Sequence, residues 1–274
     1  MGLFGSSKKP EDYVYQGIAM LQENKPKVAA NLFKKALKSD PKNITALYNH
    51  GLALNQMRKY QDAITSFDKV IEINPKDAPS YNNRAIAMAE LGDTDEALEW
   101  YDKAINADKK YAAAHYNKGV LLDKKLRPDE ALKCLDDAIT LDSKKDNPRF
   151  YKGIVLGKIK KHEEALNCFQ NVYRNNKNHL DAYFQTGIQL AELDRHEQAV
   201  KVFDNILKKY EKFRDNANVI YAKARSKAAL DETGEALELL RLATKRSKEI
   251  KKWAVEEKAF DRLLGTPEFE DIIK

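Results

Sequence analysis

The sequence contains few cysteines, and their placement argues against a disulfide framework. Cys134 and Cys168 are the two cysteines among 274 residues, and they occupy the same position in adjacent copies of a repeat that is described below. Equivalent helices of neighbouring repeats pack with axes roughly 8 to 10 Å apart, whereas a disulfide needs Cα atoms within about 7 Å of each other. We therefore predict two free, half-buried thiols and a reducing compartment.

The sequence also lacks long apolar runs, so neither a membrane-spanning helix nor a secretory signal is predicted. No stretch approaches the run of about 18 apolar residues that a membrane-spanning helix needs. The first residues, MGLFGSSKKP, lack the apolar core of a secretory signal, because Lys8 and Lys9 come too early. The location predicted from these two absences is cytoplasmic.

Motifs for catalysis or metal binding are not found either. The sequence has no Cys-x-x-Cys, His-Glu-x-x-His, P-loop or Gly-x-Ser-x-Gly pattern. Of the histidines, His162 and His196 fall at the start of predicted helices near a surface turn, and the others stand singly. We predict a protein that is not an enzyme and has no metal site and no cofactor.

A motif, or phrase, of 34 residues is repeated along most of the sequence. Residues 44–77, ITALYNHGLALNQMRKYQDAITSFDKVIEINPKD, have small residues at positions 8 and 20, larger ones at 11 and 24, and proline at 32. Positions are counted from the first residue of the phrase, and the same residue types recur before and after it with the same period. This period is typical of a helix–turn–helix repeat. Only Gly or Ala fits where two helices cross closely, so positions 8 and 20 mark the crossing.

The chain is predicted to hold a leader, seven repeats and a cap. Residues 1–9 are rich in Gly, Ser and Lys and form a flexible leader. Residues 251–274 break the period, and we expect a capping helix to about Leu264, ended by Gly265 and Pro267, with a short tail. The repeats cover residues 10–250 as 10–43, 44–77, 78–111, 112–145, 146–179, 180–213 and 217–250.

These repeated residues resemble the tetratricopeptide repeat over about residues 10–250, although the family's tryptophan at position 4 is replaced throughout. The resemblance implies an all-α fold: a right-handed superhelical α-solenoid of about seven helix–turn–helix repeats plus a C-terminal capping helix. It also implies a non-catalytic scaffold or adaptor. Members of the family hold a peptide or helix of a protein partner in a concave groove that the first helix of each repeat lines.

Positions 5 and 6 of each first helix face away from its packing stripe and hence toward the predicted groove. An asparagine carboxamide both donates and accepts hydrogen bonds, so a row of them can pair with the backbone of an extended peptide. Aromatic side chains dominate binding hot spots. The alternative is that these residues pack between repeats, tie neighbouring helices together or face water. The candidate peptide-binding residues are Tyr48, Asn49, Asn82, Asn83, Tyr116, Asn117, Phe150, Tyr151, Phe184 and Gln185.

The sequence argues against one ligand of the family, the C-terminal carboxylate of chaperones. Tetratricopeptide domains that grip the C-terminal carboxylate of chaperones place Lys or Arg at position 5 of one repeat and at positions 2 and 6 two repeats later. Without cations there is no charge-assisted grip on a carboxylate. Here those positions hold Val14, Pro79 and Asn83, or Tyr48, Ala113 and Asn117.

The formal net charge of +6 is unevenly distributed. Near the end of the array, six cations lie close together in sequence with Glu249 as the one acid between them. An alternative function is therefore an adaptor that docks to RNA, an anionic membrane or an acidic partner through this end. Elsewhere lysines alternate with acids, which argues against a nucleic-acid track. The cations are Arg241, Lys245, Arg246, Lys248, Lys251 and Lys252.

The amino terminus carries a short lipidation pattern. Gly2 and Ser6 satisfy the M-G-x-x-x-[ST] pattern of N-myristoylation, with Lys8 and Lys9 following. The pattern is degenerate, and membrane binding is expected only if Gly2 is modified. The identity of the protein partner is not encoded in any pattern that we recognise.

Overall fold

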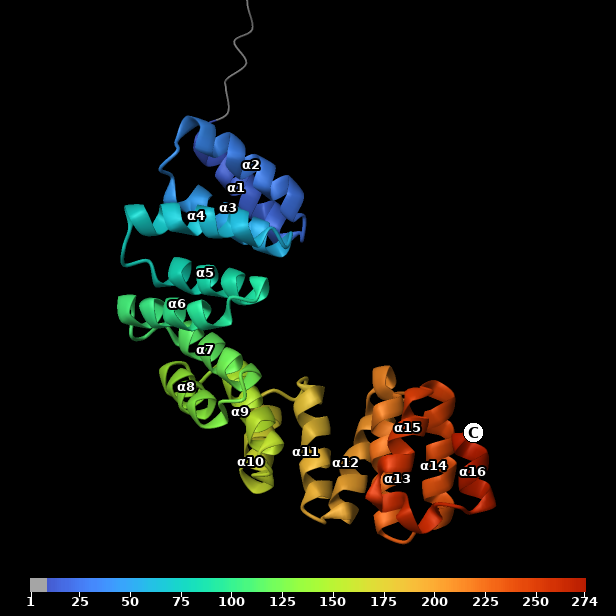
Figure 1. The fold of residues 1–274 in the computed structure, drawn as a ribbon. Helices are drawn as coiled ribbons and strands as arrows, with labels where there is room; N and C mark the ends of the chain where they lie inside the picture. The colour runs from blue at the N-terminus through green and yellow to red at the C-terminus, as the bar shows by residue number, and fades with distance from the viewer. Residues whose placement is uncertain (1–8) are drawn as a thin grey trace, which may run out of the picture. The chain divides into compact units, whose positions relative to one another are not determined.

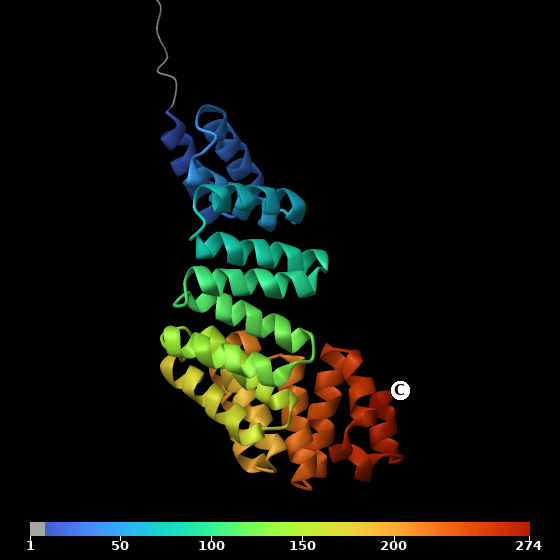
Figure 2. The ribbon, with the colours of Figure 1, turned by 60° about the vertical axis from the view of Figure 1, so that its left-hand side comes forward.

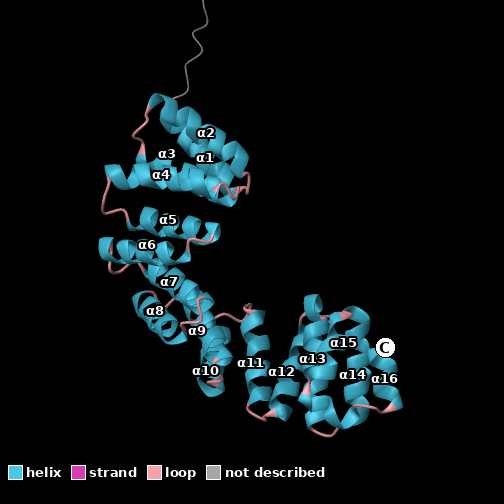
Figure 3. Cartoon of the chain, viewed as in Figure 1, coloured by secondary structure: helices cyan, strands magenta, loops and turns pink. Residues whose placement is uncertain are grey.

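The computed structural model describes residues 9–274. Within this range the regular elements are all helices, as the repeat pattern predicts (Figure 3). None of these helices has the length and apolarity that crossing a bilayer requires. Contacts divide the chain into two compact units, with the boundary between Lys144 and Lys145. Each unit is described by itself below.

The first unit consists of successive helical hairpins. Each helix packs against the next in chain order, and the coloured ribbons from blue to green follow that order (Figures 1 and 2). Its helices are α1 (Pro10–Gln22), α2 (Pro26–Ser39), α3 (Ile44–Gln56), α4 (Tyr60–Ile73), α5 (Ala78–Leu91), α6 (Thr94–Ala107), α7 (Ala112–Lys124) and α8 (Pro128–Leu141).

The second unit continues the same pattern and ends in shorter helices. Its hairpins again pack in chain order (Figure 1). Its elements are α9 (Asp146–Lys158), α10 (His162–Asn175), α11 (Leu180–Glu192), α12 (His196–Lys209), the 3-10 helix η1 (Glu211–Phe213), α13 (Ala217–Ala229), α14 (Thr233–Arg246), α15 (Glu249–Glu256), η2 (Lys258–Leu263) and α16 (Pro267–Ile273).

Local sequence explains where these helices begin. The side chains of Asn43 and Asp77 accept hydrogen bonds from the third backbone N–H of α3 and α5, each at 2.9 Å. Such caps satisfy a backbone donor that has no partner within the helix. Pro26 and Pro128 open α2 and α8, as predicted, because proline's fixed φ suits a first turn and its missing N–H is not needed there.

In four hairpins the glycine at position 8 lies under the phenylalanine ring at position 24 of the second helix. A Cβ atom on Gly51 would come within 2.6 Å of Phe67, and one on Gly153 within 2.7 Å of Phe169. Both phenylalanines are fully buried. The prediction that helices cross at this position is therefore confirmed, and the ring at position 24 is what excludes a side chain.

The turn inside each hairpin uses one left-handed residue at position 15. In five of the six hairpins where it is not glycine it is polar or charged, for example Arg58 at φ 58° and Asp194 at φ 58°. Leu126 has φ 58°, and Gly92 has φ 100°. The next backbone N–H returns to the carbonyl at position 11, as from Arg127 to Leu122 at 2.9 Å. This closing bond is the Schellman type that terminates many helices.

The C-terminal segment differs from the single helix that we predicted to about Leu264. Helix α15 ends at Glu256, Glu257 is extended, and η2 follows. Pro267 does not end a helix but begins α16, which Thr266 caps through its side chain. Phe260 and Phe269 are fully buried against residues of α13 and α14. The segment thus covers the last hairpin, but in three short pieces.

Candidate functional site

The aromatic residues at position 5 are half-buried on the helix face that we predicted to bind a partner. Tyr48 packs edge-on against Phe67, with ring centroids 6.0 Å apart. Phe150 meets Phe169 in the same way at 5.4 Å, and Phe184 meets Phe203 at 5.9 Å. One side of each ring therefore belongs to its own hairpin, which is the packing role that we considered as the alternative.

In the first unit, the asparagines and Tyr48 form hydrogen bonds that link successive first helices. Asn83 Nδ2 donates to the Tyr48 hydroxyl at 3.0 Å and to the Pro79 carbonyl at 2.8 Å. Asn117 Nδ2 donates to Asn82 Oδ1 at 2.9 Å. The row therefore ties α3 to α5 and α5 to α7, as the alternative interpretation of these residues anticipated.

These bonds decide which atoms of the row are available to a ligand. Both amide hydrogens of Asn83 are engaged, so its carboxamide oxygen is the group that it can offer. Asn49 Nδ2 donates to the Thr45 carbonyl of its own helix at 2.9 Å. Burial raises the pKa of Tyr48 to about 12, so its phenol remains neutral and can both accept and donate.

The second unit carries its own set of candidate residues. Phe150 and Tyr151 lie on α9, and Phe184 and Gln185 lie on α11; all four are half-buried. The Phe150 ring also packs near the imidazole of His179, with centroids 4.7 Å apart. The predicted row is therefore divided between two units, and each part is a candidate surface by itself.

Tyr15 is a candidate residue that our sequence reasoning passed over. It lies at position 6 of the first repeat, equivalent to Asn49, and its side chain is 72% exposed. It borders a hollow of about 140 Å³ between α1 and α3. Five of the lining residues come from positions 2, 5, 6 and 9 of first helices, which is the signal that could have found the site: Glu11, Val14, Tyr15, Ile18 and Thr45. Asn43, the residue before α3, completes the lining.

The basic cluster near the end of the array is less positive than its sequence suggests. Arg241 pairs with Asp271 at 2.7 Å, and Arg246 pairs with Asp215 at 2.8 Å. Both acids are distant in sequence and were not counted in our local charge. Lys245, Lys248 and Lys251 join Arg241 in lining a hollow of about 300 Å³, and Lys252 is exposed.

The remaining sequence predictions concern chemistry. Cys134 and Cys168 are half-buried thiols that form no disulfide within residues 9–274, as predicted, and burial raises the pKa of the Cys134 thiol. Among residues 9–274 no group of three or more His, Cys, Asp and Glu side chains is placed to hold a metal ion. Gly2 and Ser6 lie outside the described residues.

The fold and the row of first helices together define the α-solenoid class of proteins. Such a protein consists of consecutive helical hairpins, and here the two helices of a hairpin cross at a small residue. Sequence comparison identifies the family. Models of the tetratricopeptide repeat match residues 43–110, 82–148 and 181–212. The chain belongs to the tetratricopeptide repeat family. A model of the anaphase-promoting complex (cyclosome) subunit 3 matches residues 3–70.

Solved structures agree with this assignment. YrrB, a tetratricopeptide repeat protein with an unusual peptide-binding site, is 26% identical, with a TM-score of 0.60 over 69% of this chain and 97% of its own. A repeat protein from Parabacteroides merdae is 19% identical, with a TM-score of 0.60 over 89% and 96%. PilF of Pseudomonas aeruginosa is 21% identical, with a TM-score of 0.61 over 83% and 95%. No curated protein sequence matches the chain at a significant level.

Proposed function

We propose that this protein is a non-catalytic scaffold that binds an extended segment or a helix of a partner protein on the face of its first helices. Repeat proteins of this family serve as platforms for protein–protein interaction. The comparison with YrrB supports a peptide as the ligand, since that protein has a peptide-binding site and shares 26% of its residues with this chain.

The observation that carries the proposal is the hollow between α1 and α3. Tyr15 lies beside this hollow, and its ring is largely exposed. An exposed aromatic ring next to apolar residues often marks a surface where a partner binds. Val14 and Ile18 supply an apolar floor, and Thr45 supplies a polar edge. An aromatic anchor beside a small hollow is a common feature of peptide-binding surfaces.

The asparagine row gives the proposed site its polarity. Because the amide hydrogens of Asn83 are already used within the protein, Asn83 offers its carboxamide oxygen to an N–H group of a bound peptide. Asn82, by contrast, is buried and its oxygen accepts from Asn117, so it supports the row from within. The internal bonds also fix the side chains in place before binding, which lowers the entropy cost of recognition. In the second unit, Phe150, Tyr151, Phe184 and Gln185 form the corresponding proposed surface.

A selection from a peptide library displayed on phage tests the proposal. Peptides captured by the full chain would be synthesised and titrated against wild type, Tyr15→Ala and Asn49→Ala. Both substitutions should leave the fold intact, because Tyr15 is 72% exposed and the hydrogen bond that Asn49 donates stays within α3. We expect each to weaken binding by about tenfold, the equivalent of about 1.4 kcal/mol.

Asn171→Ala is the matched control. Its amide makes the same bond within a helix, to the Asn167 carbonyl at 2.8 Å, but on a second helix. It should bind the selected peptides as wild type does. Failure to select any peptide, or equal affinities for all four proteins, would contradict the proposed face.

A further inference from the structure

Ion pairs recur between neighbouring hairpins at fixed repeat positions. The residue at position 7 of a first helix is a cation, and it pairs with an aspartate at position 25 of the preceding second helix. Three such pairs are Arg84–Asp68 at 2.6 Å, Lys118–Asp102 at 2.5 Å and Lys223–Asp204 at 3.0 Å.

These cations fill the space between successive second helices. The side chains of Arg84 and Lys223 are only 13% and 12% exposed. The Arg84 guanidinium also lies over the Trp100 ring, 3.5 Å from its centroid. Since a half-buried cation needs a fixed anion close by, the aspartate at position 25 is part of the interface between repeats.

Two interfaces have other residues at these positions, and each of the two borders an open cleft. Between the hairpins of α10 and α12, the two positions hold Thr186 and Gln170, beside a cleft of about 440 Å³. Between those of α2 and α4 they hold His50 and Lys34, beside a cleft of about 480 Å³. In the second case the aspartate has been replaced by a residue of opposite charge.

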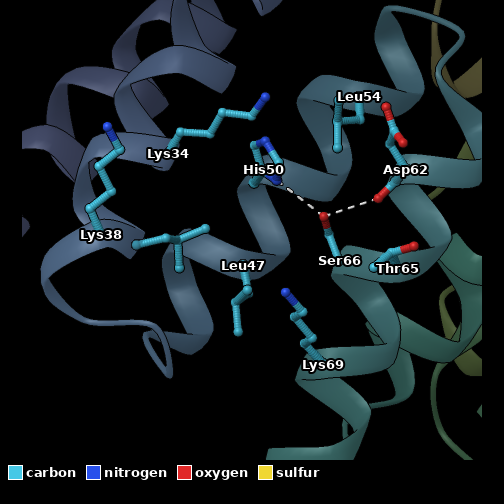
Figure 4. A pocket seen from close by; sticks show the side chains of 10 residues that line it. Lys34, Lys38, Leu47, His50, Leu54, Asp62, Thr65, Ser66 and Lys69 are labelled. Carbon is cyan, nitrogen blue, oxygen red and sulfur yellow. Dashed lines mark hydrogen bonds between the residues drawn. The ribbon is translucent and has the colours of Figure 1, made fainter.

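The cleft at Lys34 has a distinct lining (Figure 4). Lys34 and Lys38 reach it from α2, and Lys69 reaches it from α4. No ion pair to these three lysines is found in the described part of the chain. Asp62 is the one acid in the lining, so the formal charge there is positive, and apolar contact comes from Leu37, Leu47 and Leu54.

We propose that this cleft binds a carboxylate side chain from an acidic segment of a partner protein, which takes the place of the aspartate missing at position 25. The lysines supply charge-assisted hydrogen bonds. The leucines suit the aliphatic part of a glutamate and its apolar neighbours, while Asp62 disfavours a densely charged polyanion such as RNA. The site is on the side of the second helices and is separate from the proposed peptide-binding face.

The hydrogen bonds and the pKa of His50 are consistent with a cleft that has no aspartate at position 25. Ser66 Oγ donates to the Asp62 carbonyl at 3.2 Å, so it accepts from His50 Nδ1 at 3.1 Å, and Nε2 is buried without a partner in the described residues. Burial, helped by Lys34 and Lys69, lowers the pKa of His50 to about 4, and Asp62 opposes this. A bound carboxylate would raise that pKa, which gives an NMR readout.

The test uses a fluorescent peptide in which glutamates alternate with leucine and serine, and a control peptide with glutamine in place of glutamate. Binding to the full chain would be followed by fluorescence anisotropy at low and high salt. We expect the glutamate peptide to bind at least about tenfold more tightly than the glutamine peptide, with an advantage that falls as salt rises.

Two variants locate the binding. Lys34→Gln/Lys69→Gln should lose the preference for glutamate. Lys34→Asp/His50→Lys restores the pair of the other interfaces, and it should lose the preference while melting at the wild-type temperature or above. Lys27→Gln, at an exposed residue of α2 that does not line the cleft, is the control for the loss of a surface lysine outside the cleft.

Retained preference in both cleft variants, or equal binding of the two peptides to wild type, would overturn the proposal. Competition by inorganic phosphate or single-stranded RNA as effective as that of free glutamate peptide would assign the cleft to another ligand class and also overturn it. Binding that survives Tyr15→Ala and Asn49→Ala would show that the cleft acts independently of the first-helix face.

Discussion

At the scale of single residues, a glycine and a phenylalanine act as a matched pair in four of the hairpins. Gly17, Gly51, Gly153 and Gly187 each lie under a ring at position 24. In the other three hairpins the two positions hold Ala85 and Tyr101, Gly119 and Leu135, and Ala224 and Leu240. Position 8 thus stays small throughout, whereas close contact between a glycine and a phenylalanine ring is a feature of four hairpins.

Gly153→Ala tests this pair. The added methyl would lie 2.7 Å from Phe169, so we expect a loss of roughly 1 to 3 kcal/mol in the free energy of unfolding, measured by urea denaturation. Gly234→Ala is the control, because a Cβ there meets nothing within 4 Å. That variant should be neutral or gain up to about 1 kcal/mol from higher helix propensity. Equal effects of both changes would refute the packing argument.

His50 should make the stability of the first unit depend on pH. Its pKa is lowered to about 4 in the folded chain, whereas the unfolded value is about 6.5. Between these values the unfolded chain binds more protons, so stability decreases as the pH falls from about 6.5 towards 4. Thermal unfolding of His50→Gln should lose less stability than wild type between pH 7 and pH 5. A parallel decline in the two proteins would mean that His50 is not responsible.

At the scale of elements, most hairpin turns contain a strained backbone conformation, a non-glycine residue with positive φ at position 15. Position 15 requires a left-handed conformation, which glycine adopts freely and other residues adopt at a cost of about 1 kcal/mol. Only the hairpin of α5 and α6 uses glycine there, at Gly92, among the hairpins described. Position 15 therefore offers a route to stabilise the array without changing any packed surface.

Leu126→Gly should stabilise the hairpin of α7 and α8. Leu126 has φ 58° and its side chain is 88% exposed, so the substitution relieves strain and loses little packing. We expect a gain of up to about 1 kcal/mol in chemical denaturation. Gly92→Ala, the reverse change at the equivalent position, should destabilise the chain. A loss of stability in Leu126→Gly would show that the leucine makes contacts that matter more than the strain.

At the scale of the whole molecule, each hairpin depends mainly on its neighbours. In such an array the loss of one contact should loosen the adjoining repeat rather than every repeat. The last hairpin, α13 and α14, is covered by α15, η2 and α16, with Phe260 buried among them. The cap is therefore expected to determine how readily this end of the chain opens.

Phe260→Ala should act locally. Removing a fully buried ring costs about 3 to 5 kcal/mol in a well-packed core. Hydrogen exchange measured by mass spectrometry should accelerate most in residues 217–246 and least in residues 10–73, which belong to the other unit. Uniform acceleration along the chain would mean that the two units unfold as one cooperative body.

The sequence alone determined the helical repeats and their period, because the identity of residues at positions 8, 20 and 24 follows directly from how two helices cross. It also indicated that the two cysteines do not form a disulfide. Tertiary structure decided what depends on distant partners: Asn83 is bound to Tyr48, Arg241 is paired with Asp271, and Lys34 lies in one cleft with Lys69 and Asp62. Hydrogen bonds and ion pairs depend on distances of a few ångströms across repeats, and the period fixes only which positions face each other, not whether the side chains there bind.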